Sequence, residues 1–254
     1  MKRWILTAAL LVLVAVPGAV LAQTDVAALT AAARKGDPQA QNQLGALYAA
    51  GVEVRQDFAA ARSWWSLAAG QGLAGARYNL GMMYESGSGV VADPVAAARW
   101  YALAARVGDA AASYRLGLLY ESGQGVKKDD TQAVSCYRQA AEQGLADAQN
   151  ALGRMYEMGR GLRQNVAEAR RWYKKAAEQG QVFAQSNYGF QLYARAKEPR
   201  ERIEAYAWLF LAAEKGNAIA IAHRAELASQ LTPQQLEKGE ARAMVIRREI
   251  SARQ

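Results

Sequence analysis

The 254-residue sequence predicts an all-α fold, a solenoid of helical hairpins that repeat along the chain. The first observation is a glycine that returns every 36 residues, as from Gly45 to Gly81 (81 − 45 = 36). Two glycine series keep this step: Gly45, Gly81, Gly117, Gly153 and Gly189, and Gly36, Gly72, Gly108, Gly144, Gly180 and Gly216. A fixed period in this range is typical of stacked units that bury a continuous core between neighbours. We therefore expect five repeats over residues 39–216.

The second observation is helical spacing within each repeat. Alanine, leucine and tyrosine stand four positions apart, as in Ala76, Leu80 and Tyr84, which places them on one face of a first helix. A glycine follows the leucine inside this helix, where it costs roughly 1 kcal/mol relative to alanine. We expect that a neighbouring helix approaches closely at this glycine.

A turn and a second helix complete each repeat. The first helix is predicted to end at a left-handed glycine, and the second to begin after an N-cap with Pro94 at its first position in one repeat. The glycines are Gly51, Gly87, Gly123 and Gly159, and the N-caps are Asp57, Asp93, Asp129 and Asn165. The second helix carries an aromatic column: Trp64, Trp100, Cys136, Trp172 and Trp208. Packing beside small residues explains this column better than a ligand-binding stripe does.

The repeats are flanked by segments that we expect to close the stack. Residues 23–38 are predicted to form a half-repeat with Asp25 as its N-cap. Residues 217–254 are predicted to form capping helices, the last of them starting at a capping box at Thr232. The fifth repeat lacks the turn glycines over residues 195–199, which predicts a locally altered turn.

The first 22 residues have the pattern of a secretory signal peptide. Lys2 and Arg3 precede an apolar run over residues 4–16, and residues 20–22 have the form of a cleavage site after Ala22. An uncleaved anchor is the alternative. Cleavage would lower the net charge from +8 to +6, because the segment holds two bases and no acid. We expect a periplasmic or secreted protein with no stable membrane insertion.

The sequence offers no recognisable catalytic, metal or cofactor site. A solvated basic surface explains the mild positive charge better than an anionic envelope partner, and no lysine- and arginine-rich block indicates nucleic acid. Cys136, the only cysteine, cannot form an internal disulfide and falls at a position expected to be packed. It lies in a different repeat from His223, the only histidine, so the two form no nucleophilic pair by local spacing. We predict that the protein is not an enzyme.

The repeat resembles the Sel1-like repeat, a relative of the tetratricopeptide repeat. The residues that carry the likeness read A-x-x-x-L-G-x-x-Y-x-x-G-x-G-V-x-x-D and then A-x-x-W-Y-x-x-A-A-x-x-G, over residues 39–216. The resemblance implies a right-handed α-solenoid that serves as a scaffold for protein partners. A cysteine-rich secreted branch of the family is associated with penicillin binding or weak β-lactamase activity. This chain departs from that branch because it lacks paired cysteines.

By analogy with the tetratricopeptide fold, variable positions of the first helices should line a concave face that binds a protein partner. One row is Asn42, Tyr78, Tyr114, Asn150 and Ser186; a second is Ala46, Met82, Leu118, Arg154 and Phe190; a third is Ala49, Glu85, Glu121, Glu157 and Tyr193. Aromatic, arginine and exposed apolar side chains together suit protein binding. Alternatively, the three glutamates only solvate the turn beside them, and Met82 and Leu118 are partly core.

Three functions remain open from the sequence. The leading hypothesis is an exported, non-enzymatic adaptor for a protein partner in the bacterial envelope. The second is a cell-wall protein that interacts with peptidoglycan or penicillin, and the third is a secreted effector that engages host proteins.

Overall fold

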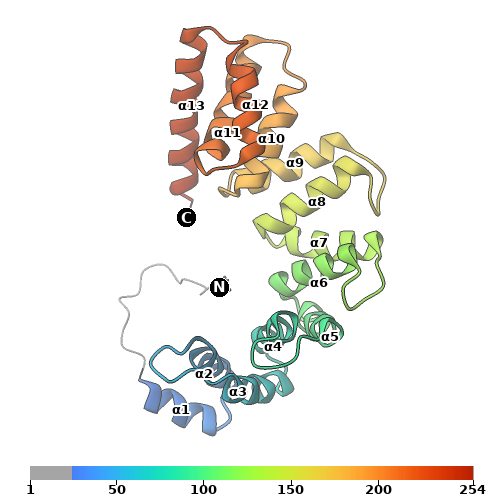
Figure 1. Cartoon of the computed structure of the whole chain (residues 1–254), viewed down its shortest axis with the longest axis vertical. Helices are drawn as coiled ribbons and strands as arrows, with labels where there is room; N and C mark the ends of the chain where they lie inside the picture. Colours follow the sequence, from blue (N-terminus) through green and yellow to red (C-terminus); the bar gives the residue numbers. More distant parts are fainter. Residues whose placement is uncertain (1–24, 254) are drawn as a thin grey trace, which may run out of the picture. The chain divides into compact units, whose positions relative to one another are not determined.

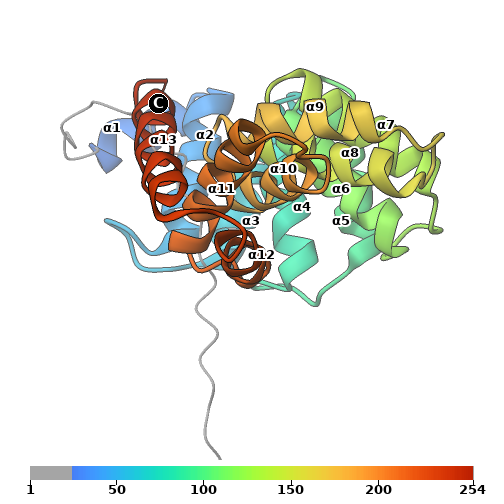
Figure 2. The ribbon, with the colours of Figure 1, turned by 90° about the horizontal axis from the view of Figure 1, so that it is seen from above.

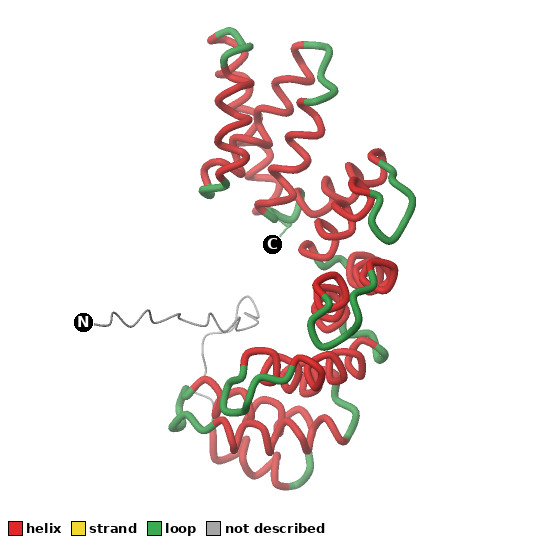
Figure 3. The backbone as a smooth tube through the Cα atoms, turned by 45° about the vertical axis from the view of Figure 1, so that its right-hand side comes forward, coloured by secondary structure: helices red, strands yellow, loops and turns green. Residues whose placement is uncertain are grey.

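The computed structural model describes residues 25–253, and these residues form 13 helices and no strand (Figure 1, Figure 3). The predicted all-α fold is therefore confirmed. The predicted signal peptide lies outside the described residues. Successive helices pack as hairpins, so each repeat contributes a first and a second helix. The chain divides into two compact units, residues 1–104 and 105–254, which are described separately.

The first unit holds the helices from α1 to α5. Their bounds are α1 (Val26–Arg34), α2 (Pro38–Ala50), α3 (Phe58–Gly70), α4 (Ala74–Ser86) and α5 (Pro94–Ala105), whose last residue belongs to the second unit. Helix α1 packs on α2, α2 on α3, and α3 on α4. Buried side chains from α2, α3 and α4 form a common core around Trp65 and Leu80.

The second unit holds the helices from α6 to α13. Their bounds are α6 (Ala110–Ser122), α7 (Asp130–Glu142), α8 (Ala146–Met158), α9 (Val166–Ala177), α10 (Val182–Tyr193), α11 (Pro199–Glu214), α12 (Ala218–Ala228) and α13 (Pro233–Ser251). The last helix, α13, lies beside α11 (Figure 2) and begins at the predicted capping box on Thr232. It ends at Ser251.

The predicted helix ends are confirmed by their hydrogen bonds. The carboxylates of Asp57, Asp93 and Asp129 each accept from two backbone N–H groups of the helix that follows. The four predicted glycine caps, Gly51, Gly87, Gly123 and Gly159, adopt the left-handed conformation. The first repeat has Glu53 where later repeats have a second turn glycine, and Glu53 takes a positive φ of 60° in its place. This backbone turn is therefore kept without the glycine.

The recurring glycine inside the first helix is explained by close packing, as predicted. A Cβ atom on Gly81 would lie 2.5 Å from the ring of Tyr101, and one on Gly117 would lie 2.6 Å from the ring of Tyr137. The residues that cover this glycine were not predicted from the sequence. The residue after each tryptophan covers the glycine, while Trp64, Trp100 and Trp172 are only half-buried. The covering residues are Trp65, Tyr101, Tyr137, Tyr173 and Leu209.

The fifth repeat has the altered turn that its sequence predicted. Helix α10 ends at Tyr193 with Ala194 in a right-handed conformation, so no left-handed cap forms. Helix α11 starts at Pro199 and runs for 16 residues, with a capping box between Glu198 and Glu201. In this turn, a glutamate capping box starts the second helix, and no glycine caps the end of the first helix.

Cys136 is buried, as predicted, and desolvation raises the pKa of its thiol to about 11. Since the thiolate is the reactive form, the folded protein should react with iodoacetamide at pH 8 at least ten-fold more slowly than the urea-unfolded protein. Mass spectrometry of timed samples measures both rates. Equal rates would contradict the packed position of this side chain.

Candidate functional site on the first helices

Each glutamate of the third predicted row accepts a hydrogen bond from a buried tyrosine of the same repeat. The hydroxyl of Tyr101 donates to Glu85 at 2.5 Å, that of Tyr137 to Glu121 at 2.6 Å, and that of Tyr173 to Glu157 at 2.6 Å. All three tyrosine side chains are fully buried. The glutamates therefore do more than solvate a turn, because each satisfies a hydroxyl that burial would otherwise leave unpaired.

No role was predicted for these tyrosines from the sequence. Burial, and then the hydrogen bond to the glutamate, raise the pKa of Tyr137 and Tyr173 well above the ordinary value, so both remain protonated donors. A tyrosine 16 residues after a glutamate in three successive repeats was the signal that could have found them.

The two tyrosines of the first predicted row pack on these buried rings. The ring centroids of Tyr78 and Tyr101 are 5.7 Å apart, and those of Tyr114 and Tyr137 are 5.8 Å apart, with tilts of 44° and 42°. Tyr78 and Tyr114 are themselves half-buried. Packing on a fixed ring restricts their rotamers, so they are presented at the surface in defined positions.

Glu121 is the centre of a polar cluster in the second unit. Besides the Tyr137 hydroxyl, it accepts from Nη2 of Arg154 at 2.7 Å and from Nη1 of Arg160 at 2.9 Å. Arg160 also pairs with Asp130 at 2.7 Å, and its guanidinium holds the pKa of that carboxyl below the ordinary value. Arg154 is thus an internal ion-pair partner, although its side chain remains 40% exposed.

The other predicted residues connect successive first helices within each unit. The Asn42 side chain accepts from Asn79 at 2.9 Å in the first unit, and Asn150 accepts from Asn187 at 3.0 Å in the second. Glu157 also accepts from Gln191 of the next first helix. These bonds hold the predicted rows in register between neighbouring repeats of one unit.

The apolar members of the rows remain partly accessible. Met82 and Leu118 are half-buried, and Phe190 is 37% exposed with its ring centroid 4.6 Å from that of His223. His223 lies 3.7 Å from Glu226 of the same helix. His223 is therefore an aromatic packing partner, and it lies in a different part of the second unit from Cys136 of α7.

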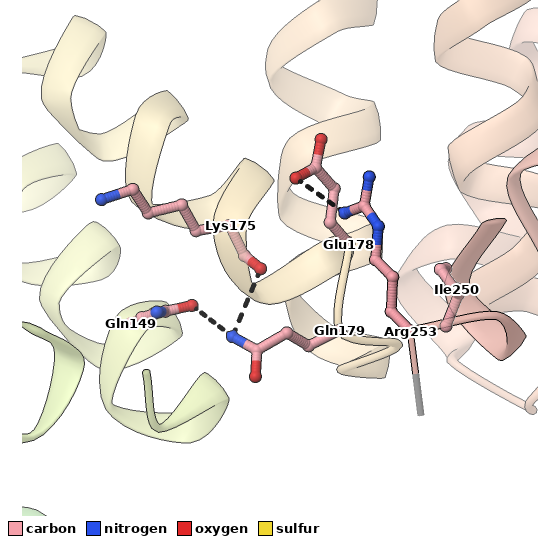
Figure 4. Close-up of a pocket in the computed structure, with 6 residues that line it drawn as sticks. All are labelled: Gln149, Lys175, Glu178, Gln179, Ile250 and Arg253. Carbon is pink, nitrogen blue, oxygen red and sulfur yellow. Dashed lines mark hydrogen bonds and ion pairs between the residues drawn. The ribbon is translucent and has the colours of Figure 1, made fainter. Parts of the chain in front are cut away.

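A hollow of about 380 Å³ lies away from this face, between α8, α9 and the end of α13 (Figure 4). Gln179 donates to the side chain of Gln149 at 2.8 Å, and Arg253 pairs with Glu178 at 3.3 Å (Figure 4). The first bond joins the end of α9 to α8, and the ion pair joins the end of α13 to the end of α9.

No group of three or more histidine, cysteine, aspartate or glutamate side chains within residues 25–253 could hold a metal ion. Of the helices that the structure describes, none is both long and apolar enough to cross a membrane.

Stacked two-helix repeats with a continuous core define a helical-repeat protein of the solenoid class. The Sel1 repeat model matches five consecutive segments: residues 38–73, 74–109, 110–145, 146–181 and 182–217. The chain belongs to the Sel1 repeat family. No curated protein sequence matches it.

Solved structures agree with this assignment. The chain is 30% identical to c5321, a protective antigen of uropathogenic Escherichia coli strains with an SLR fold, with a TM-score of 0.69. That match covers 90% of this chain but 56% of the antigen, so the chain spans little more than half of it. A Sel1 repeat protein from Oxalobacter formigenes is 27% identical with a TM-score of 0.68, and the match covers 87% of this chain and 99% of that one.

Proposed function

We propose that the chain is an exported, non-enzymatic adaptor of the bacterial envelope that binds a protein partner through its first helices. The surface that carries the three predicted rows of residues on these helices is called the first-helix face. The packing of Tyr78 and Tyr114 on buried tyrosines is the observation that carries this proposal. An aromatic side chain that is already ordered loses little conformational entropy on binding, and tyrosine is enriched among residues that dominate binding energy.

The surroundings of Tyr114 support a protein ligand. Leu118 offers partly accessible apolar surface one turn away on the same helix, and the Arg154 side chain is 40% exposed. Such a mixture of an aromatic anchor, apolar area and arginine is typical of protein interfaces. Export rests on the signal-peptide pattern of residues 1–22.

The test is recovery of partners from a periplasmic extract by the mature chain, starting at Gln23. We expect that changing Tyr78 and Tyr114 together to alanine lowers recovery of the main partner at least ten-fold, because both anchors are removed. Quantitative mass spectrometry of the bound fraction measures this.

The matched control changes Tyr84 and Tyr120 to alanine. These half-buried tyrosines lie on the same two helices, α4 and α6, and Tyr120 packs against the buried core of the second unit. The control separates lost packing from lost anchoring. Equal recovery by both double variants would contradict the proposed face, and release of muropeptides by the purified protein would contradict a non-enzymatic role.

A further inference from the structure

A second surface of the first unit, on the second helices, is not explained by the proposed function. Leu67 near the end of α3 is 53% exposed, and Leu103 near the end of α5 is 39% exposed. They occupy the same repeat position (103 − 67 = 36), each three residues after a half-buried tryptophan, Trp64 or Trp100. We call Leu67, Leu103 and the Arg77 side chain beside them the leucine–arginine surface.

Arg77 connects the two helix ends. Its Nε donates to the carbonyl of Ala69 at 3.3 Å, and its Nη1 donates to the carbonyl of Leu103 at 3.1 Å. The guanidinium therefore lies between the ends of α3 and α5 and is fixed by the backbone of both. It forms no ion pair with any carboxylate of the described residues.

The charged side chains of α3 and α5 have one sign. The sequences of α3 and α5 contain Arg62 and Arg99 but no aspartate or glutamate. Asp57 and Asp93 cap the opposite ends of these two helices, and the carboxylate of Asp109, six residues after Leu103 (109 − 103 = 6), is used to cap α6. A partner that covers the leucines would therefore meet positive charge that the first unit leaves without a counter-ion.

In the second unit, the end of a helix lies beside the same repeat positions. There Lys175 and Gln149 stand where the first unit has leucine and Arg77 (175 − 103 = 72, 149 − 77 = 72), and both line the hollow closed by Ile250 and Arg253 of the α13 end (Figure 4). The basic Arg253 pairs there with the acidic Glu178 of α9. The element beside these positions is thus a helix end that an ion pair attaches to the end of α9.

We propose that the leucine–arginine surface binds an acidic amphipathic helix of a partner protein. Apolar side chains of that helix would cover Leu67 and Leu103, and a carboxylate would pair with the outward edge of Arg77. Helix-in-groove recognition uses such apolar side chains three or four positions apart. A lipid surface fits less well, because the guanidinium is held between two helix ends and cannot extend toward flat headgroups.

The test uses a displayed library of 16-residue helical peptides, selected against the mature chain starting at Gln23. We expect enrichment of peptides that combine leucine-type residues at helical spacing with glutamate or aspartate. Fluorescence anisotropy then measures the affinity of the enriched peptides for the wild type and its variants, and thermal unfolding confirms that each variant is folded.

Each variant introduces the residue that another repeat of this chain has at the same position, so the substitution is compatible with the fold. Leu67→Gln with Leu103→Gln places glutamine where Gln139 stands in a later repeat, and Arg77→Gln copies Gln41 and Gln149, which also donate to a preceding helix carbonyl. We expect the leucine pair to weaken binding at least ten-fold. Arg77→Gln should weaken peptide binding several-fold and make the affinity less dependent on salt.

Ile219→Gln is the control, since Ile219 is 60% exposed on α12 of the second unit. It should leave the affinity unchanged. The proposal is overturned if no acidic amphipathic peptide is enriched, if the enriched peptides are basic, or if they bind the leucine variant as well as the wild type. Binding of anionic phospholipid vesicles that depends on Leu67 and Leu103, without peptide binding, would also overturn it.

Discussion

Replacing Gly161 by alanine should lower the free energy of unfolding by about 3 kcal/mol. Gly161 has a φ of 69°, and a left-handed conformation costs an alanine about 1–2 kcal/mol. A Cβ atom here would also lie 2.2 Å from the carbonyl oxygen of Asp130, a backbone atom at the start of α7. Relieving that overlap requires the turn to move away from the preceding repeat, which adds about 1–3 kcal/mol.

Gly144→Ala is the matched control for this prediction. Gly144 also has a positive φ, 96°, but an added Cβ would meet nothing within 4 Å. This variant should therefore lose only about 1 kcal/mol, the conformational part of the effect. Urea unfolding followed by far-ultraviolet circular dichroism measures both variants. Equal losses would show that contact between the turn and α7 contributes nothing to stability.

The Gly161 contact illustrates what the sequence could and could not predict. The glycine period, the helix caps and the capping box at Thr232 follow from local rules that act within a few residues, and all of them were predicted correctly. The reason for the second turn glycine is not local. It depends on α7 of the preceding repeat, about 30 residues earlier (161 − 130 = 31), and the sequence pattern does not show which surfaces meet there.

The helices that carry the candidate residues were predictable, but the chemistry of these residues was not. The sequence located Glu121 and Arg154 on the face of the first helices and offered two roles for the glutamates, partner contact or solvation of a turn. Their hydrogen bonds show a third role, because an acceptor on one helix satisfies a tyrosine buried under the next. A side chain that appears at regular spacing can thus be on the surface and still support the core.

Removal of the Glu121 carboxylate is expected to lower the free energy of unfolding by about as much as Gly161→Ala does. In Glu121→Ala the buried Tyr137 hydroxyl loses its acceptor, which costs about 1–3 kcal/mol. Arg154 and Arg160 lose a shared counter-ion whose side chain is 14% exposed. Both guanidinium groups are partly exposed and can turn toward water, which limits the total loss to about 3 kcal/mol.

Two further substitutions separate the hydrogen bond from the charge. Glu121→Gln keeps an acceptor for Tyr137 but removes the negative charge, so it should lose about half as much as Glu121→Ala. Glu142→Ala, at an exposed position on α7, should change stability by less than about 0.5 kcal/mol. Urea unfolding at low and high salt distinguishes the contributions, because the ion-pair part weakens with salt while the tyrosine bond does not. If Glu121→Ala were as stable as Glu142→Ala, the cluster would contribute nothing to the fold, and its arginines would be available to a partner. The first-helix face would then be defined by charge rather than by the two packed tyrosines.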